Sequence, residues 1–179
     1  MPKSLAKVHK QISKKTKGNI SSLHENSRNS QRLRRAGARD DKIARVSKAR
    51  AKANRPRLQR VAFFQGAAIA ADGPIDVEVM QMLIQRHIQR DDEELATLKS
   101  ERRPGRPSST REDLLGQRIA TEQREYDTGF WLPDMEDKEN LRLLRDWNGE
   151  WTSLSTVKYI RLSRNGLRHE SSFPPNGES

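Results

Sequence analysis

The run Leu58-Gln-Arg-Val-Ala-Phe-Phe-Gln-Gly-Ala-Ala-Ile-Ala-Ala71 is the first part of this chain with enough apolar side chains to build a core. Its spacing predicts one helical face, made of Leu58, Val61, Ala62, Gln65 and Ile69. Phe63 and Phe64 flank that face, and Asp72-Gly73-Pro74 supplies the turn residues that end the helix. The run therefore marks the start of a folded body.

Upstream of this run the chain is strongly basic. Residues 1–60 hold nine Lys and ten Arg against one Glu and two Asp, a net charge of +16, whereas the other 119 residues carry −5. These sixty residues contain no Phe, Trp or Tyr and so have little with which to build a core. We expect a basic arm at 1–55, a helical body at 56–166 and a disordered tail at 167–179.

The bulk composition agrees with an arm joined to a small domain. Hydrophobic residues make up 32% and charged residues 33%, against about 45–50% and about 25% in average globular chains. The chain has no cysteine, which excludes disulfides and thiolate metal sites. It also lacks a secretory signal and a run long and apolar enough to span a membrane, so we expect a soluble intracellular protein.

The arm itself divides into three segments. In residues 3–17, Leu5, Val8 and Ile12 share one helical face between lysines, and an isolated helix of this length is marginal in water. We therefore expect that segment to become ordered on binding. Residues 18–30 are polar and aperiodic, which predicts a spacer.

A second, Arg/Lys-rich helix is expected at about 40–53. Asp40 and Asp41 suit its first turn, since carboxylates stabilise the positive end of the helix dipole. Pro56 disrupts a helix interior, so this helix is expected to end by about Arg55.

The body reads as a series of helices. Asp76 is the expected N-cap of a helix that runs to about Arg102, and the capping box Ser109-x-x-Glu112 starts another that ends at Thr128-Gly129. A helix at about 135–147 is stopped by Asn148-Gly149. The predicted fold class is all-α, with four to five helices.

Two features of the body remain open at this point. The turn Ser163-Arg-Asn-Gly166 fits a short β-hairpin near 157–168 and fits a helical turn nearly as well. Trp131, Trp147 and Trp151 lie among periodic leucines, which favours the core over a partner surface for all three.

No arrangement typical of a catalytic or cofactor site occurs. None of the four His has a His partner at i+3 or i+4, and His87 falls on an apolar helix face that favours core packing. No glycine-rich loop matches a nucleotide fingerprint, and the acidic run Asp91–Glu94 lacks calcium-loop spacing. We expect no enzymatic activity, no cofactor, no metal and no small-molecule substrate.

The basic arm instead indicates an anionic partner. Lipid is disfavoured, because the arm lacks the Trp, Phe and Leu face of an interfacial helix. Nucleic acid is favoured over a merely solvated tail, since neutralising phosphates releases condensed counterions. The absence of aromatic residues for base stacking favours folded RNA bound by its backbone, and an architectural DNA- or chromatin-binding protein is the alternative.

The predicted RNA-contacting residues are the basic side chains of the arm and of the turn RRPGRP at 102–107, which could equally be a plain connector. They are Lys3, Lys7, Lys10, Lys14, Lys15, Lys17, Arg32, Arg34, Arg35, Arg39, Lys42, Arg45, Lys48, Arg50, Arg102, Arg103 and Arg106. Lys14-Lys-Thr-Lys17 and Arg32-Leu-Arg-Arg35 are also typical of a two-part nuclear import signal, a use compatible with RNA binding.

The order of several short segments resembles the fungal form of the translation machinery-associated protein 16 family. They are KSLAK (3–7), RDDKIA (39–44), VAFFQ (61–65), IQRDDEEL (88–95), the turn at 102–110, LPD (132–134), LLRDWNG (143–149) and Ile160-Arg161. The resemblance extends to about Gly166.

The resemblance implies a non-enzymatic ribosome-biogenesis factor. It would associate with precursors of the large (60S) ribosomal subunit in the nucleus and nucleolus. The lack of cysteine also suits the cytoplasm as a further location. Its implied partners are rRNA and ribosomal proteins of that particle, which it would bind as a monomer, with no membrane partner. The family supplies no established RNA-contacting residue to carry over.

Overall fold

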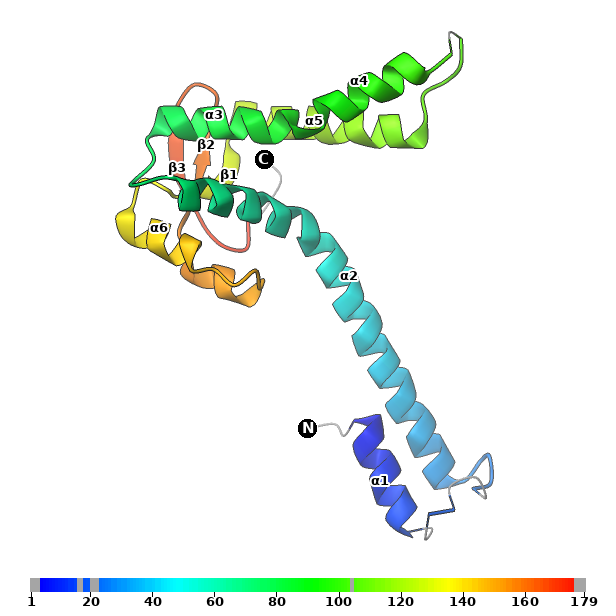
Figure 1. Ribbon diagram of the computed structural model, residues 1–179. Helices are drawn as coiled ribbons and strands as arrows, with labels where there is room; N and C mark the ends of the chain where they lie inside the picture. Colours follow the sequence, from blue (N-terminus) through cyan, green and yellow to red (C-terminus); the bar gives the residue numbers. More distant parts are fainter. Residues whose placement is uncertain (1–3, 16–17, 20–22, 104, 176–179) are drawn as a thin grey trace. The chain divides into compact units, whose positions relative to one another are not determined.

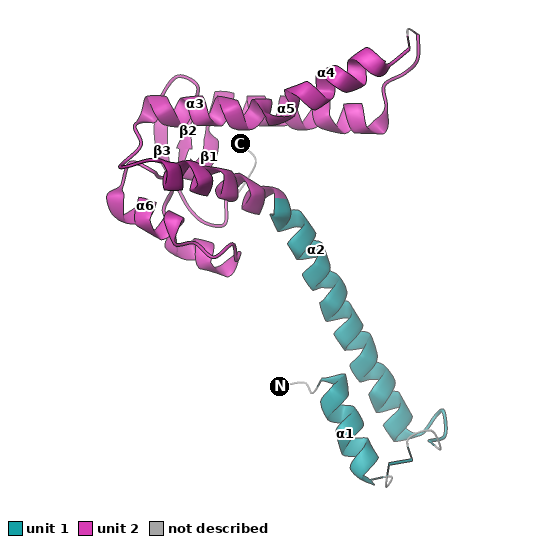
Figure 2. Ribbon diagram, in the orientation of Figure 1, with its two compact units in different colours: residues 1–55 teal, residues 56–179 magenta. Residues whose placement is uncertain are grey.

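A computed structural model describes residues 4–15, 18–19, 23–103 and 105–175. The chain forms two compact units, residues 1–55 and residues 56–179, shown in separate colours in Figure 2. Helix α2 (Arg28–Ala70) contributes residues to both of them.

The first unit is an antiparallel pair formed by α1 (Leu5–Lys15) and the first part of α2, which lie side by side in Figure 1. Val8 and Ile12 of α1 are buried against Ala36 of α2, with exposures of 3%, 1% and 2%. The predicted apolar face of residues 3–17 is thus present, although Leu5 is 38% exposed. The segment expected to become ordered only on binding has a packing partner within its own chain.

Helix α2 has 43 residues and replaces the two separate helices predicted at about 40–53 and from Leu58. It begins at Arg28, inside the predicted spacer of 18–30, and continues through Pro56, so the prediction that Pro56 ends a helix is wrong. Proline removes a single i→i−4 hydrogen bond, and here strong helix formers lie on its N-terminal side. The carbonyl freed by Pro56 belongs to Lys52, an exposed residue whose backbone water can reach.

The face of α2 that enters the core of the second unit differs from the predicted one. Val61, Phe64 and Ala68 are all fully buried, whereas Ile69 is 63% exposed. These three follow i, i+3 and i+7 spacing, so the buried face includes Phe64, which was expected to flank it, and leaves Ala62 exposed. The helix ends at Ala70, next to the predicted Asp72-Gly73-Pro74 turn.

The single helix predicted to run from Asp76 to about Arg102 is divided. It forms α3 (Val77–Ile88), a 3-10 turn η1 (Gln89–Asp91) and α4 (Asp92–Glu101). Asp76 occupies the N-cap position as expected, although its side chain makes no capping hydrogen bond. The break coincides with ion pairs of Arg90 with Glu122 and of Asp91 with Arg118. Periodicity along one helix does not encode such contacts with a distant one.

Helix α5 (Thr110–Thr128) has the predicted ends. The Ser109 hydroxyl accepts a hydrogen bond from the Glu112 backbone N–H at 3.1 Å, which confirms the N-terminal half of the capping box. At the other end Gly129 has a φ of 142°. A Cβ at that position would lie 3.2 Å from the Cβ of Arg161, so the close approach of that residue also favours glycine.

A three-stranded antiparallel sheet follows, so the all-α fold class is only approximate. Its order is β1 (Phe130–Pro133), β2 (Tyr159–Leu162) and β3 (Arg168–Ser171), with Phe130 opposite Leu162 and Tyr159 opposite Ser171. Of the two possibilities left open for the turn at 163–166, the structure has the hairpin, formed by β2 and β3. Strand β1 was missed because all four of its residues are buried, which removes the alternation that marks a strand.

The remaining elements, α6 (Lys138–Arg145) and the 3-10 helix η2 (Thr152–Thr156), complete the body. Helix α6 is shorter than the predicted 135–147 because the Asp137 side chain caps it by accepting from Glu139 N–H at 2.9 Å. Gly149, with a φ of 84°, supplies the expected left-handed turn.

The core of this unit contains the predicted aromatic residues. Trp131 and Trp147 are buried and Trp151 is half-buried. Part of the tail expected to be disordered over 167–179 instead forms β3, and Phe173 packs on the ring of Trp151 at 4.6 Å between centroids. Residues 176–179 of that tail lie outside the described residues. The backbone of β3 is hydrogen-bonded to β2, and the local sequence of the tail gave no sign of this pairing.

Candidate nucleic-acid interface

Two polar contacts hold α1 on α2 within the first unit. The Leu5 backbone N–H donates to Asp40 Oδ2 at 2.8 Å, and Arg32 Nη2 donates to Gln11 Oε1 at 3.0 Å. Asp40 was expected in the first turn of its own helix, but it lies within α2 and caps α1 instead. Together with the buried Val8, these contacts set the position of α1 along α2.

A groove of about 430 Å³ lies beside this helix pair. Four arginines of α2 line it at i, i+4, i+7 and i+11 spacing, namely Arg28, Arg32, Arg35 and Arg39. Its apolar lining consists of Val8 and Ala36. No acidic side chain is among the described residues that line the groove, so every charged side chain of the lining is positive.

The next part of α2 is a fully exposed basic helix. Every residue from 41 to 53 is exposed, including Ile43 at 61% and Val46 at 41%. Lys42, Arg45 and Lys48 project from this stretch with no described side chain packed over them. Its position within the first unit leaves these charges accessible to a polyanion.

Most of the residues predicted to contact RNA are exposed in the structure. On α1 these are Lys7, Lys10, Lys14 and Lys15, and on α2 they are Arg32, Arg34, Arg35, Lys42, Arg45, Lys48 and Arg50. Arg39 is half-buried. Lys3 and Lys17 lie outside the described residues.

Some of these residues already have acidic neighbours. Arg34 lies 3.7 Å from the carboxylate of Glu25, and both side chains are exposed. In the turn after α4, Arg102 pairs with the buried Glu112 of α5 at 3.2 Å, so it stabilises the second unit. Arg103 and Arg106 stay exposed in that turn, where Arg106 N–H donates to the Arg103 carbonyl at 3.1 Å.

Arg28 is the groove residue that sequence reasoning missed. It lies in the predicted polar spacer and is therefore absent from the predicted RNA-contacting residues. The signal that could have found it is the 28/32/35/39 spacing, which continues the helical pattern of Arg32, Arg35 and Arg39 by one turn.

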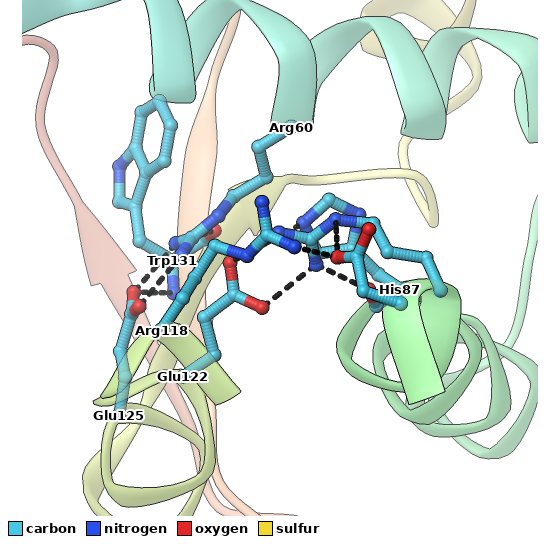
Figure 3. A network of polar contacts seen from close by, with 8 residues as sticks. Arg60, His87, Arg118, Glu122, Glu125 and Trp131 are labelled. Carbon is cyan, nitrogen blue, oxygen red and sulfur yellow. Dashed lines mark hydrogen bonds and ion pairs between the residues drawn. The ribbon is translucent and has the colours of Figure 1, made fainter. Parts of the chain in front are cut away.

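The second unit contains a buried polar network, drawn in Figure 3. Arg60 makes two hydrogen bonds to the Glu125 carboxylate, at 2.6 and 2.7 Å, and its guanidinium carbon lies 4.0 Å from the centroid of the Phe130 ring. Glu125 also accepts from Trp131 N–H at 3.1 Å. The pair thereby ties α2, α5 and β1 together.

A second part of this network surrounds Glu122 of α5. Arg90 binds its carboxylate through two hydrogen bonds of 2.7 Å, and Asp91 pairs with Arg118. The 3-10 turn between α3 and α4 directs Arg90 and Asp91 towards α5, where both residues make these contacts. The network joins elements of the body, and none of its members comes from the first unit.

His87 lies in this region as a neutral aromatic residue. Burial, together with the positive charges of Arg90, Arg60 and Arg118, lowers the pKa of His87 from 6.5 to about 3. Its Nε2 is 3.9 Å from Glu122, but a neutral imidazole forms no ion pair there. The ring packs against Phe63 at 4.9 Å and Phe64 at 5.9 Å, which places it in the core, as expected.

The described residues contain neither a candidate metal cluster nor a membrane-spanning helix. No cluster of three or more His, Cys, Asp or Glu is placed to hold a metal ion in the ranges that the structure describes. Across the same ranges, no helix combines the length and apolarity needed to cross a bilayer.

Comparison with known proteins gives one consistent result. The family model for translation machinery-associated protein 16 matches residues 19–164. A Saccharomyces cerevisiae protein of that name is 40% identical over 168 residues, covering 92% of this chain and 93% of its own length. A Danio rerio protein of the same name is 34% identical over 89 residues, covering 47% of this chain and 46% of its own length.

Proposed function

The chain belongs to the translation machinery-associated protein 16 family, and from that premise we propose that it is a non-enzymatic assembly factor for the large ribosomal subunit. The proposal has three parts: the protein associates with pre-60S particles, it binds rRNA through the basic first unit, and its helical body docks on ribosomal proteins or an RNA junction. It acts as a monomer on the particle.

The observation that carries RNA binding is the exposed charge of the first unit. Residues 1–55 hold 17 Lys and Arg against three Asp and Glu, a net charge of +14, while residues 56–179 carry −3. The helix pair and the stretch at 41–53 present this charge on the surface. If about ten side chains met RNA phosphates, log K would fall with log salt at a slope near −7.

The same surface favours binding to the RNA backbone over reading of bases. The first unit contains no aromatic residue on which an unpaired base could stack. Arginine and lysine neutralise phosphates without regard to sequence, and folded RNA offers closely spaced phosphates to a narrow helix pair. In this proposal the protein works in the nucleus and nucleolus, where pre-60S particles are assembled, and also reaches the cytoplasm.

Sedimentation of cell extract on a sucrose gradient tests this function. We expect the full-length protein to migrate with large-subunit precursors and to return to the top of the gradient in high salt. A protein found only with chromatin, with none on large-subunit particles, would instead favour an architectural DNA-binding role for the same arm.

A further inference from the structure

We propose that the groove beside α1 and α2 is the principal phosphate-binding site of the arm, and that one RNA strand lies along its four arginines. This inference rests on the proposed RNA-binding function and deepens it, because it assigns the main contact to one surface. The alternative within the same function is that the positive charge of residues 1–55 acts diffusely, with no preferred site.

The length of the arginine row suits a nucleic-acid strand. Arg28 and Arg39 are eleven residues apart on one helix, which corresponds to about 16 Å at about 1.5 Å per residue. The rise of about 3.4 Å per phosphate of a DNA strand is measured along the duplex axis. Because the strand winds around that axis, neighbouring phosphates are farther apart than this rise, and about three to four of them span the arginine row. Four guanidinium groups can therefore meet successive phosphates of one strand.

The groove also orients the guanidinium groups better than an open helix surface does. Arg32 is held by its hydrogen bond to Gln11 Oε1, which reduces the freedom it would lose on binding. Below it, Val8 and Ala36 are nearly completely buried and give the groove an apolar floor. Charge–charge attraction is stronger beside such low-dielectric surface than in open water.

A second contribution comes from the start of α2. The Ser27 hydroxyl accepts from Ser30 N–H at 3.2 Å, so the helix is ordered from its first turn. The positive end of its dipole then adds to the field of Arg28. The stretch at 41–53 carries comparable charge, but all of its residues are exposed and it lies in the interior of α2, away from the helix terminus.

The regular row favours a phosphodiester strand over an acidic protein surface. Phosphates repeat at constant spacing along a strand, which matches a row of arginines one helical turn apart. A guanidinium fork can also bind two oxygens of one phosphate. An acidic peptide has no fixed spacing of carboxylates, so it gains less from this order.

The test uses the full-length protein and a synthetic RNA stem-loop, with affinity measured by fluorescence anisotropy over a series of salt concentrations. One variant carries R28Q, R32Q, R35Q and R39Q. The matched control carries K42Q, R45Q, K48Q and R50Q, and so loses the same number of charges from the exposed stretch. Glutamine preserves helix propensity, and circular dichroism checks that both variants keep the helix content of the wild type.

We expect the groove variant to lower the magnitude of the salt slope by about 3, since each lost phosphate contact removes about 0.7–0.9. The control should lose less than half as much. A third variant with lysine at the same four groove positions should keep most of the wild-type slope, because it retains the charge. If it behaved like the glutamine variant, the loss would reflect a disturbed helix pair and not phosphate contacts.

Other results would contradict the inference, and each would show which part of the proposal is wrong. Equal losses in the groove variant and the control would show diffuse binding and reject the groove alone. Failure of the wild type to bind the RNA would reject the proposed function as well. Tighter binding of the wild type to poly-glutamate than to RNA would identify an acidic protein as the partner.

Discussion

The side chain of Asp40 caps a helix that begins thirty-five residues earlier, by accepting a 2.8 Å hydrogen bond from the backbone N–H of Leu5. A carboxylate suits that position because the first turn of α1 has unsatisfied N–H groups and the positive end of the helix dipole. The basic arm is therefore a folded helix pair before it meets any partner.

Asp40→Ala should loosen α1 from α2. Loss of a capping side chain costs about 1 kcal/mol, which corresponds to roughly fivefold more frequent opening. Hydrogen exchange of the α1 amides in the full-length protein measures this opening. Asp41→Ala removes the same charge from an exposed neighbour, and equal exchange rates in the two variants would contradict the capping role.

Arg60→Ala should destabilise the body. Its partner Glu125 would keep a largely buried charge without compensation, and the contact with the Phe130 ring would be lost. We expect a loss of about 2–3 kcal/mol, somewhat below the roughly 3–5 kcal/mol of a fully buried pair. Urea unfolding measures it.

Arg142→Ala is the matched control for this ion pair. Arg142 and Asp146 are 86% and 74% exposed, and such a surface pair contributes little. The unfolding midpoint of this variant should stay close to the wild-type value. A shift as large as that of Arg60→Ala would show that burial does not decide the effect.

His87 should make the stability of the body depend on pH. Its pKa is about 3 in the folded protein and about 6.5 when unfolded, so between these values the unfolded chain binds more protons. The stabilisation that comes from keeping His87 neutral in the folded protein is complete above about pH 6.5 and is lost as the pH falls towards 3. Between about pH 7 and pH 5 the loss amounts to about 2 kcal/mol.

His87→Phe should remove this part of the pH dependence, because phenylalanine fits the aromatic cluster and does not titrate. Urea unfolding at both pH values measures the difference. His169→Gln, at an exposed position on β3, serves as the control and should leave the dependence intact. An unchanged dependence in His87→Phe would assign it to the carboxylates of the body.

Phe173→Ala should destabilise the body although the residue lies near the end of the chain. The ring packs at 4.6 Å from Trp151 and 5.7 Å from Tyr159, and its loss should cost about 2 kcal/mol. Tryptophan fluorescence should change with it. Leu167→Ala, at a site 61% exposed, should have little effect, and equal effects would argue against ordered packing of the tail.

Deletion of residues 1–55 should leave the body folded and abolish particle binding. The second unit has its own core, and the truncated chain would begin at Pro56, where proline suits the start of a helix. Thermal unfolding should remain cooperative with the same midpoint, and gradient sedimentation should show no comigration. Normal binding at physiological salt would make the body the anchor and the arm accessory.

The sequence was most informative where the signal is local. Ser109 caps the residue three positions later, and Gly149 adopts its positive φ within one turn, so both helix ends follow from a few adjacent residues. The prediction at Pro56 is wrong because it considered the energetic cost of a proline inside a helix without the helical segments on either side of it. The pairing of Phe130 with Leu162 spans 32 positions, and no local pattern marks it.

Composition and short-range periodicity are enough to predict the charge asymmetry, most of the helices and the membership of the aromatic core. Only the tertiary structure decided that α1 packs on α2 and that Arg28, Arg32, Arg35 and Arg39 share a groove with Val8. A groove requires two helices in a fixed register, and Asp40, Gln11 and the buried Val8 and Ile12 set that register through contacts between residues far apart in the chain.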